Sequence, residues 1–275
     1  MFVPLAFLKK WKERARAAAD GQLETAVPLT DDQVRATWLT ASWLVGYPDD
    51  AVVERLDLIE QLAGTLPAGV SADLLDAARS VRETDPETIR AEYVETFDTR
   101  RRGCLYLTYF TNGDTRKRGM ALLDIKQTYR EAGLEVSDDE LPDHLAYVLE
   151  FGAAHDLHRG VSILLSNRAG LELLRIHLDE TGSSWAGVLR AVCATLPALD
   201  GDDIRAVDRL IAEGVQEEFV GLTGYGYEDG SADMPPADMS PYAIDPAGPP
   251  ASSFTDPAPG GTTFIPLSDV KGLQR

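Results

Sequence analysis

Two histidines, His155 and His158, offer the most direct opportunity for metal chemistry in this sequence. Residues three apart on a helix share one face, and the carboxylates of Glu150 and Asp156 lie close by. Two imidazoles and a carboxylate can ligate a metal ion. However, the pair straddles the end of a helical pattern at HDLHRG, and no further Cys or His cluster accompanies it. We therefore interpret it as a solvated helix terminus and predict no metal site.

The segment FDTRRRGCLYLTYFTNGDTRKRG places basic clusters at residues 100–102 and 116–118 on either side of an aromatic patch. Such a pattern binds nucleic acid only where a basic face neutralises several phosphates. The chain has 26 Lys and Arg against 45 Asp and Glu, so its formal net charge of -19 repels DNA and RNA. We expect Asp98 to pair with or cap the first cluster and Asp114 to cap the helix that holds the second. The sequence therefore predicts ion pairs with neighbouring acidic helices and no nucleic-acid partner.

The segment DELPDHLAYVLEF has the signals of a helix start. Ser137 and Glu140 could form a capping box, and Pro142 suits the first helical turn. Asp143 would complement the positive end of the helix dipole. His144 would then lie at a helix start beside acidic residues that favour its charged form.

Signatures of catalysis are missing from the sequence. GLTGYGYEDG contains G-x-G, but no strand precedes it and no helix follows, so it does not predict a phosphate loop. The chain has no Walker A pattern, no G-x-S-x-G and no H-E-x-x-H. Paired carboxylates are too plentiful for one acid/base pair to stand out. We predict that the protein is not an enzyme and uses no cofactor.

The elements that must position these residues are helices. Apolar residues recur with helical spacing, and no convincing alternating strand is present. Asp residues cap the first segment, Ser71 caps the third, and Asp85 with Pro86 gives a strong start signal. The helical patterns cover nearly all of residues 31–219 and lie within 31–50, 51–67, 71–83, 85–98, 114–133, 141–156, 160–182, 183–197 and 202–219.

Composition divides the chain into three parts. With 275 residues, 44% of them hydrophobic, the chain can bury a sizeable core, which we assign to a helical domain at 31–220. Residues 221–275 are rich in Pro, Gly, Ser and Asp, and we predict a mostly disordered tail. Residues 1–30 form an extension that could be an amphipathic helix, docked on its own domain or touching a membrane surface peripherally. No stretch is long enough to span a membrane, and two distant cysteines suit the cytoplasm.

Two motifs together resemble a known family. YVETFDTRRRGCLYLTYFTNGDTRKRG, followed at this distance by ELPDHLAYVLEF, closely resembles the NarJ group of the TorD/DmsD family. These proteins are the assembly chaperones of respiratory nitrate reductase, also called its delta subunit. TWLTASWLVGYPDD is similar to the usual start of the family, and the resemblance covers roughly residues 33–220. Leu141 and Pro142 give E-L-P-D-H, the nitrate reductase version of a motif that reads E-P-x-D-H in the broader family. Ala146 and Tyr147 stand where we expect variation.

The resemblance implies a single all-α domain, a multi-helix bundle of the TorD type, without catalytic activity. Such proteins bind the N-terminal leader of a molybdenum enzyme's catalytic subunit and hold it until the molybdopterin-guanine-dinucleotide cofactor is inserted. They then dissociate, and the nitrate reductase branch also delays membrane docking of the enzyme. The implied partner here is the catalytic (alpha) subunit of nitrate reductase. By position in the motifs, the residues implied for binding are Tyr93, Asp98, Arg100, Tyr106, Tyr109, Glu140, Pro142, Asp143 and His144.

The residues themselves agree with a peptide-binding module. A leader can bind as a short helix in an apolar groove, with acidic residues receiving its basic positions. A strongly negative field speeds the capture of such a peptide. We expect the Arg clusters to brace the groove and the aromatics between them to supply apolar contact. Two alternatives stay open: a nucleotide-dependent regulator, because some relatives are suspected of binding GTP, and a generic helical adaptor.

Overall fold

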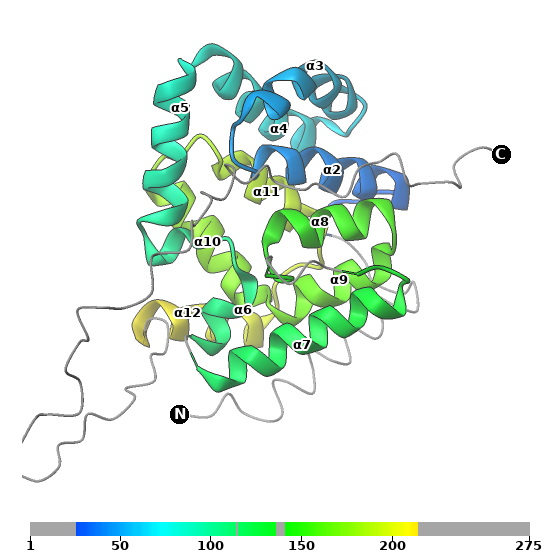
Figure 1. The fold of residues 1–275 in the computed structure, drawn as a ribbon, viewed down its shortest axis with the longest axis vertical. Coiled ribbons are helices and arrows are strands. Elements are labelled where there is room, and N and C mark those ends of the chain that lie inside the picture. The colour runs from blue at the N-terminus through cyan, green and yellow to red at the C-terminus, as the bar shows by residue number, and fades with distance from the viewer. Residues whose placement is uncertain (1–25, 114, 136–140, 214–275) are drawn as a thin grey trace, which may run out of the picture. The chain divides into compact units, whose positions relative to one another are not determined.

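Helices form all the regular structure in the described part of the chain (Figure 1). The computed structural model describes residues 26–113, 115–135 and 141–213. Within these ranges one isolated antiparallel bridge joins Tyr106 to His144, and no strand is present. The prediction of an all-α fold is therefore confirmed.

Most of the helices are short, and two of the elements are not α-helical. The π-helix η1 and the 3₁₀-helix η2 follow one another between α5 and α6. In chain order the elements are α2 (Asp31–Leu44), α3 (Asp50–Gly64), α4 (Ala68–Glu83), α5 (Pro86–Tyr93), η1 (Val94–Asp98), η2 (Arg101–Gly103), α6 (Leu107–Asn112), α7 (Arg116–Glu131), α8 (Leu145–Ala154), α9 (Leu157–Ser166), α10 (Arg168–Glu180), α11 (Ala186–Ala194) and α12 (Gly201–Glu213).

Local capping chemistry explains where several helices begin. The predicted start of α5 is confirmed, because the Asp85 side chain accepts from the main chain of the first turn and Pro86 follows it. Before α2 the cap is Thr30, which exchanges two hydrogen bonds with Gln33, and the Asp residues follow it inside the helix. Helix α4 begins at Ala68, ahead of the predicted start at Ser71. The Pro67 carbonyl accepts from the Ser71 amide, so Ser71 already lies inside the first turn.

Two further boundaries differ from the prediction. The pattern at 160–182 predicts one long helix, but the chain breaks between α9 and α10 at Asn167. The Asn167 side-chain amide donates to the Ile163 carbonyl at 2.9 Å, so the side chain takes a bond that helical main chain would otherwise make. Helix α7 is capped by Thr115, whose hydroxyl accepts from the Lys117 amide at 3.2 Å. The predicted cap, Asp114, lies outside the described residues.

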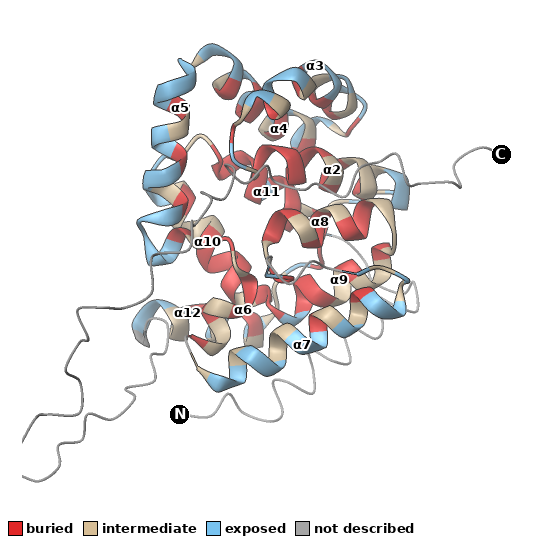
Figure 2. Ribbon diagram, viewed as in Figure 1, coloured by how far each residue is buried: buried red, intermediate tan, exposed pale blue. Residues whose placement is uncertain are grey.

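Helix α2 lies at the centre of the core and packs against α3, α8 and α11. Its Trp38 is fully buried, and the indole N–H donates to the Thr195 hydroxyl at 2.7 Å. Helices α8 and α9 meet over this indole at Gly152 and Gly160. A Cβ at Gly152 would lie 2.2 Å from the Trp38 ring, so only glycine allows this approach. Figure 2 shows the buried residues gathered on α2, α8, α10 and α11, with exposed faces on α5 and α7.

A chain of ion pairs connects α10 to α11 and α4. It begins with a buried pair, in which Arg168 lies 2.6 Å from Glu172 and both side chains are nearly inaccessible to solvent. It ends on α4, where Asp73 pairs with Arg190 of α11 at 2.6 Å. In order, the members are Arg168, Glu172, Arg175, Asp179, Arg190 and Asp73. These contacts stabilise α10 against its neighbours.

The two predicted terminal parts fall almost wholly outside the described residues. Only residues 26–30 of the extension are described, and the Ala26 amide donates to the Leu196 carbonyl at 2.9 Å. The predicted tail, 221–275, is not described, so the boundary near residue 220 stays a prediction. Within the described ranges, none of the helices is both long and apolar enough to span a membrane.

Candidate functional site

The two motifs that carry the family resemblance meet in space. Tyr106 and His144 form the isolated bridge, and main-chain hydrogen bonds lie on both sides of it. The Leu107 amide donates to the Asp143 carbonyl at 3.0 Å, and the Leu145 amide donates to the Leu105 carbonyl at 2.9 Å. The start of α6 and the start of α8 are thereby held side by side.

Asp143 is the buried centre of this junction. Its side chain is fully inaccessible, and its Oδ2 accepts from the Thr108 amide at 3.0 Å and from the Thr108 hydroxyl at 2.5 Å. Its Oδ1 has no hydrogen-bond partner. The prediction that Asp143 serves the dipole of its own helix is wrong, because the carboxylate instead caps the first turn of α6. A residue of one motif therefore completes a helix of the other.

Pro142 is buried just before the bridge, and its carbonyl accepts from the Tyr129 hydroxyl at 2.9 Å. Helix α8 begins at Leu145, so Pro142 is not in its first turn as predicted. Hydrogen bonds hold Pro142 to α7 and Asp143 to α6, so α8 starts only after both residues. Ser137 and Glu140, the expected capping box, lie outside the described residues.

His144 occupies the N-cap position of α8, and its ring packs between two tyrosines. The ring centroids lie 5.3 Å from Tyr106 and 5.1 Å from Tyr147. Burial lowers the pKa of His144 to about 4, so the ring is neutral at physiological pH. The prediction of a charged histidine is therefore wrong, because desolvation in the aromatic surroundings outweighs the acidic residues near it in sequence.

Arg118 connects the second basic cluster to the aromatic patch. Its guanidinium carbon lies 5.8 Å from the ring centroids of both Tyr106 and Tyr109, which is cation–π distance. Burial is the main cause that raises the pKa of Tyr106, and the thiol of Cys104 and the carboxylate of Asp143 add to it. Both tyrosines are half-buried, so each remains partly accessible to solvent.

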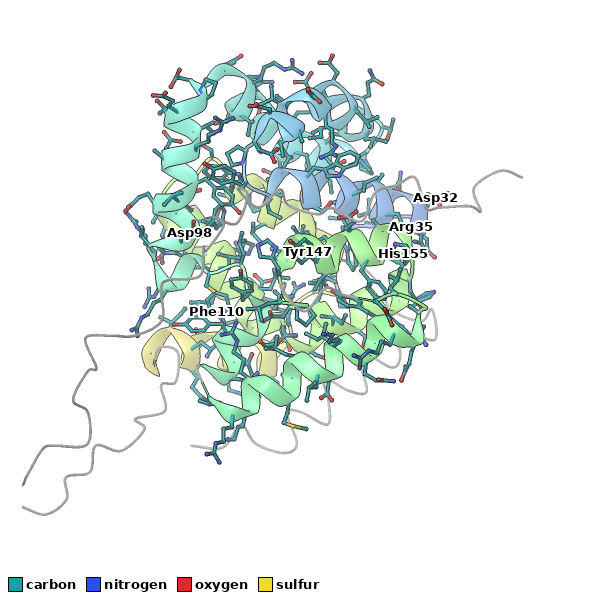
Figure 3. All side chains as sticks on the ribbon, viewed as in Figure 1. Asp32, Arg35, Asp98, Phe110, Tyr147 and His155 are labelled. Atoms are coloured by element: carbon teal, nitrogen blue, oxygen red, sulfur yellow. The ribbon has the colours of Figure 1, made fainter. Side chains whose placement is uncertain are left out.

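In the first basic cluster, Arg100 pairs with a residue close to it in the sequence. Arg100 is exposed and donates twice to Glu95 Oε1, at 3.1 and 2.7 Å. The ion pair of Arg100 therefore forms with a residue of the preceding η1 rather than with a distant helix. Asp98, labelled in Figure 3, is the exposed last residue of η1.

Tyr93 is another predicted site residue that the structure buries, here in the hydrophobic core. It is 5% exposed, and its hydroxyl donates to the Val45 carbonyl at 3.0 Å. Its ring packs against Phe97 and Trp185 at centroid distances of 4.7 and 5.6 Å. Burial raises its pKa, with a further contribution from Asp98. Tyr93 thus supports the elements beneath the junction and is not part of its open surface.

The structure brings Tyr106, Tyr109, Pro142, Asp143 and His144 together and leaves Arg100 at the periphery. Sequence reasoning missed three contributors, which are Thr108, Tyr129 and Tyr147. The sequence holds no pattern that points to Thr108 or Tyr129, because their hydrogen-bond partners are remote in sequence. Such a pattern exists for Tyr147, since it follows His144 by one helical turn, and Figure 3 shows it on α8.

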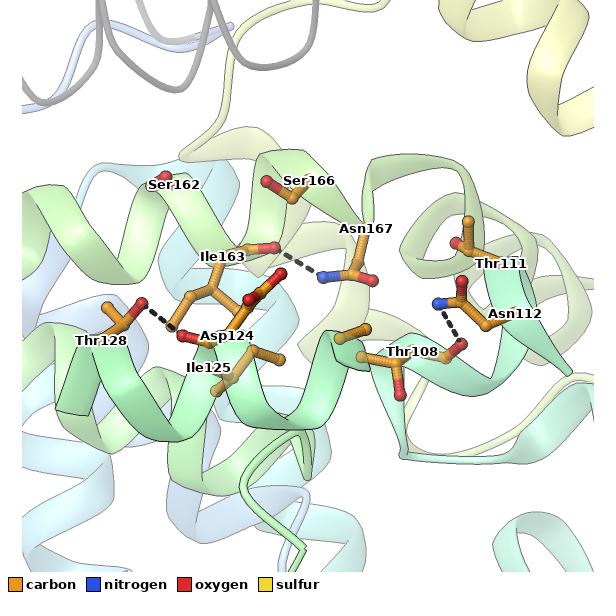
Figure 4. Close-up of a pocket in the computed structure, with 11 residues that line it drawn as sticks. Thr108, Thr111, Asn112, Asp124, Ile125, Thr128, Ser162, Ile163, Ser166 and Asn167 are labelled. Atoms are coloured by element: carbon orange, nitrogen blue, oxygen red, sulfur yellow. Dashed lines mark hydrogen bonds between the residues drawn. The ribbon is translucent and has the colours of Figure 1, made fainter. Parts of the chain in front are cut away.

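A cavity of about 320 Å³ lies next to this junction, between α6, α7 and α9 (Figure 4). Thr108 belongs to both places, because it lines the cavity and binds Asp143. The cavity is lined by Thr108, Thr111, Asn112, Ala121, Asp124, Ile125, Thr128, Ser162, Ile163, Ser166 and Asn167.

His155 and His158 do not form part of a recognisable metal centre. His155 ends α8 with its ring stacked on Phe151 at 6.4 Å, and burial lowers its pKa. The neighbouring end of α8 is closed by Arg35, which donates to the Gly152 and Ala153 carbonyls at 3.1 and 2.8 Å. Among the described residues, no three His, Cys, Asp or Glu side chains are grouped as a metal ion would require.

Fold and site together define an all-helical domain in which two distant segments are joined through a buried carboxylate. A family model described as nitrate reductase delta subunit matches residues 63–191. A probable nitrate reductase molybdenum cofactor assembly chaperone, NarJ of Bacillus subtilis, is 31% identical over 171 residues, which cover 61% of this chain and 90% of that protein. The chain therefore belongs to the nitrate reductase delta subunit family, within its NarJ group.

Two other relatives show how unevenly the chain covers similar proteins. The nitrate reductase molybdenum cofactor assembly chaperone NarJ of Escherichia coli K12 is 32% identical over 148 residues, 53% of this chain and 63% of that protein. The nitrate reductase-like protein NarX of Mycobacterium tuberculosis is 39% identical over 173 residues, 62% of this chain but only 26% of NarX. The chain thus spans about a quarter of NarX and most of the Bacillus protein. The relatives named as assembly chaperones support the prediction that this chain is not an enzyme.

Proposed function

We propose that this protein is an assembly chaperone of nitrate reductase that acts in the cytoplasm and is not part of the finished enzyme. It binds the N-terminal leader of the catalytic (alpha) subunit and holds that subunit for molybdenum cofactor insertion and membrane assembly. Family membership and the names of the NarJ relatives support the assembly role. The leader as the bound element is the finer part of the proposal.

The observation that carries the proposal is the junction of the two motifs. The Asp143–Thr108 contact holds the starts of α6 and α8 together, so the rings of Tyr106 and Tyr147 flank His144 at one surface. Leu141, 39% exposed, comes just before this turn. Half-buried aromatic residues and an exposed leucine close to them in the sequence supply apolar area that the apolar side of a short helix can cover.

Electrostatics favours a cationic partner at this surface. The chain carries a formal net charge of -19, and a field of that sign attracts a basic peptide and speeds its association. Because the pKa of His144 is about 4, its ring brings no positive charge to the junction at neutral pH. The aromatic contact and the negative field of the chain therefore both favour the binding of an amphipathic, basic leader.

Calorimetric titration with a synthetic leader peptide of the cognate catalytic subunit tests the proposal. We expect saturable binding by the wild type. His144→Ala and Tyr147→Ala should each weaken the affinity by about tenfold or more, because central aromatic contacts are lost. Leu58→Ala is the matched control, because Leu58 is 45% exposed on α3, away from the junction. Circular dichroism first establishes that each variant is folded. A folded wild type that does not bind the leader would refute the proposal.

Two further arms address the alternative functions. A scrambled peptide of the same composition separates leader recognition from a generic adaptor, because an adaptor binds both peptides alike. Thermal unfolding with and without GTP and Mg²⁺ tests the nucleotide-dependent regulator, since a ligand of the native state raises Tm. We expect selectivity for the leader and an unchanged Tm.

A further inference from the structure

Four of the polar side chains that line the cavity between α6, α7 and α9 donate hydrogen bonds within the protein. The side-chain amides of Asn112 and Asn167 donate to the Thr108 and Ile163 carbonyls at 3.1 and 2.9 Å. The Thr108 hydroxyl donates to Asp143, and the Thr128 hydroxyl donates to a main-chain carbonyl at 2.9 Å. Each amide is thereby fixed with its carbonyl oxygen left to accept, and each hydroxyl oxygen keeps a lone pair.

The charge of the cavity lining also favours a hydrogen-bond donor, because it is negative. Among the described residues that line it, Asp124 is the one charged side chain, and Figure 4 shows it reaching from α7 toward α9. Ala121, Ile125 and Ile163 supply an apolar lining. The carboxylate, the amide and hydroxyl oxygens and the apolar lining together favour a ligand that donates hydrogen bonds, carries positive charge and has an aliphatic stem. These are the properties of a lysine or arginine side chain.

The surroundings place such a side chain on a helical peptide rather than on a free small molecule. Met120 and Leu123, 63% and 56% exposed, lie on α7 beside the cavity residues Ala121 and Asp124. Large apolar side chains next to an acceptor-lined cavity match a helix that carries apolar and basic residues in turn. Thr108 connects the cavity to the buried carboxylate of the junction, so both belong to one continuous part of the fold.

We propose that this cavity is a subsite that binds one lysine or arginine side chain of the leader, with Asp124 as its charged partner. The inference rests on the proposed function, because it adds a specific contact for the same peptide. It also assigns a role to α7 and α9, because the cavity residues of these two helices lie outside both motifs.

The test compares Asp124→Asn with Glu54→Gln, which removes the same charge from an exposed position on α3. Because Asp124 is exposed and its ion pair would be screened, we expect Asp124→Asn to weaken leader binding about two- to fivefold and to reduce its salt dependence. Glu54→Gln should change neither. Leader peptides with each basic residue replaced by norleucine identify the partner, since for one of them the Asp124→Asn effect disappears. Unchanged affinity and salt dependence in Asp124→Asn would overturn the subsite while leaving the proposed function intact.

A second measurement does not depend on the leader. N-acetyl-arginine methylamide is titrated into the full chain and followed by amide chemical shifts, with the uncharged citrulline analogue as control. We expect saturable shifts at Thr128 and Ser162 with the arginine probe alone, and their loss in Asp124→Asn. If the wild type does not bind the leader but shows these shifts, the chaperone proposal fails and the basic-side-chain subsite stands. No shifts with the arginine probe in the wild type would overturn the subsite.

Discussion

Replacing Asp143 by alanine should destabilise the fold strongly, because it removes the one acceptor that serves two buried donors. The Thr108 amide and hydroxyl lie 3.0 and 2.5 Å from Asp143 Oδ2, and Thr108 is only 1% exposed. A buried donor left without a partner costs about 1–3 kcal/mol. Two such donors give roughly 2–6 kcal/mol, and loss of the unpartnered Oδ1 offsets part of it, so we expect about 3 kcal/mol.

Asp143→Asn should cost less, about 1–2 kcal/mol, because its carbonyl oxygen still accepts from Thr108 and only the new amide lacks an acceptor. Urea unfolding followed by the helical circular dichroism signal measures both variants. A loss of about 3 kcal/mol lowers the urea midpoint by roughly 1–2 M at the slopes usual for domains of this size. Asp76→Ala is the control, since Asp76 pairs with Arg79 at a surface where the two side chains are 71% and 59% exposed. Its cost should stay below about 1 kcal/mol.

The reasoning is refuted if Asp143→Ala lies within about 1 kcal/mol of the wild type, because water would then be replacing the lost acceptor. It is also refuted if Asp143→Asn is the less stable variant. That order would mean that the unpartnered side of the carboxylate, and not the Thr108 contact, dominates the site.

Three further predictions concern other parts of the domain. Because the pKa of His144 is lowered to about 4, the unfolded state binds more protons than the folded state between pH 6.5 and 4, and stability falls as the pH is lowered through this range. The wild type should therefore lose about 2 kcal/mol of stability between pH 7 and pH 5, and His144→Gln should not. Gly152→Ala should cost at least about 2 kcal/mol through a clash with the indole of α2, whereas Gly119→Ala, with nothing within 4 Å of its Cβ, should be neutral or slightly stabilising. Glu172→Ala leaves the 3% exposed Arg168 without its carboxylate and should cost about 3–5 kcal/mol.

Each of these predictions has its own control and its own contrary outcome. Parallel pH profiles for the wild type and His144→Gln would show that the histidine titrates normally in the fold. Equal stabilities for the two glycine variants would mean that α8 and α9 can move apart at no cost. Glu60→Ala, which breaks an exposed pair with Arg82, is the control for Glu172. If both glutamate variants cost the same small amount, then the buried pair is hydrated.

The sequence by itself determined the fold class and the start of α5. Helical periodicity and capping act within about one turn, so the start of α5 at Asp85 and Pro86 could be predicted from adjacent residues. The same local chemistry misled the prediction at Asn167, whose side chain competes with the main chain and breaks the helix. The two motifs were also visible in the sequence, but only as separate segments.

Only the tertiary structure decided what the motif residues do. The bond from Thr108 to Asp143 spans 35 residues, and no local pattern gives the packing of α6 beside α8 that makes it. Burial is likewise a property of the assembled helices. It turns His144 into a neutral ring and places Tyr93 in the core, although its motif suggests a binding surface. Hydrogen-bond partners and pKa values depend on what surrounds a side chain in space, and that environment exists only after the helices have packed.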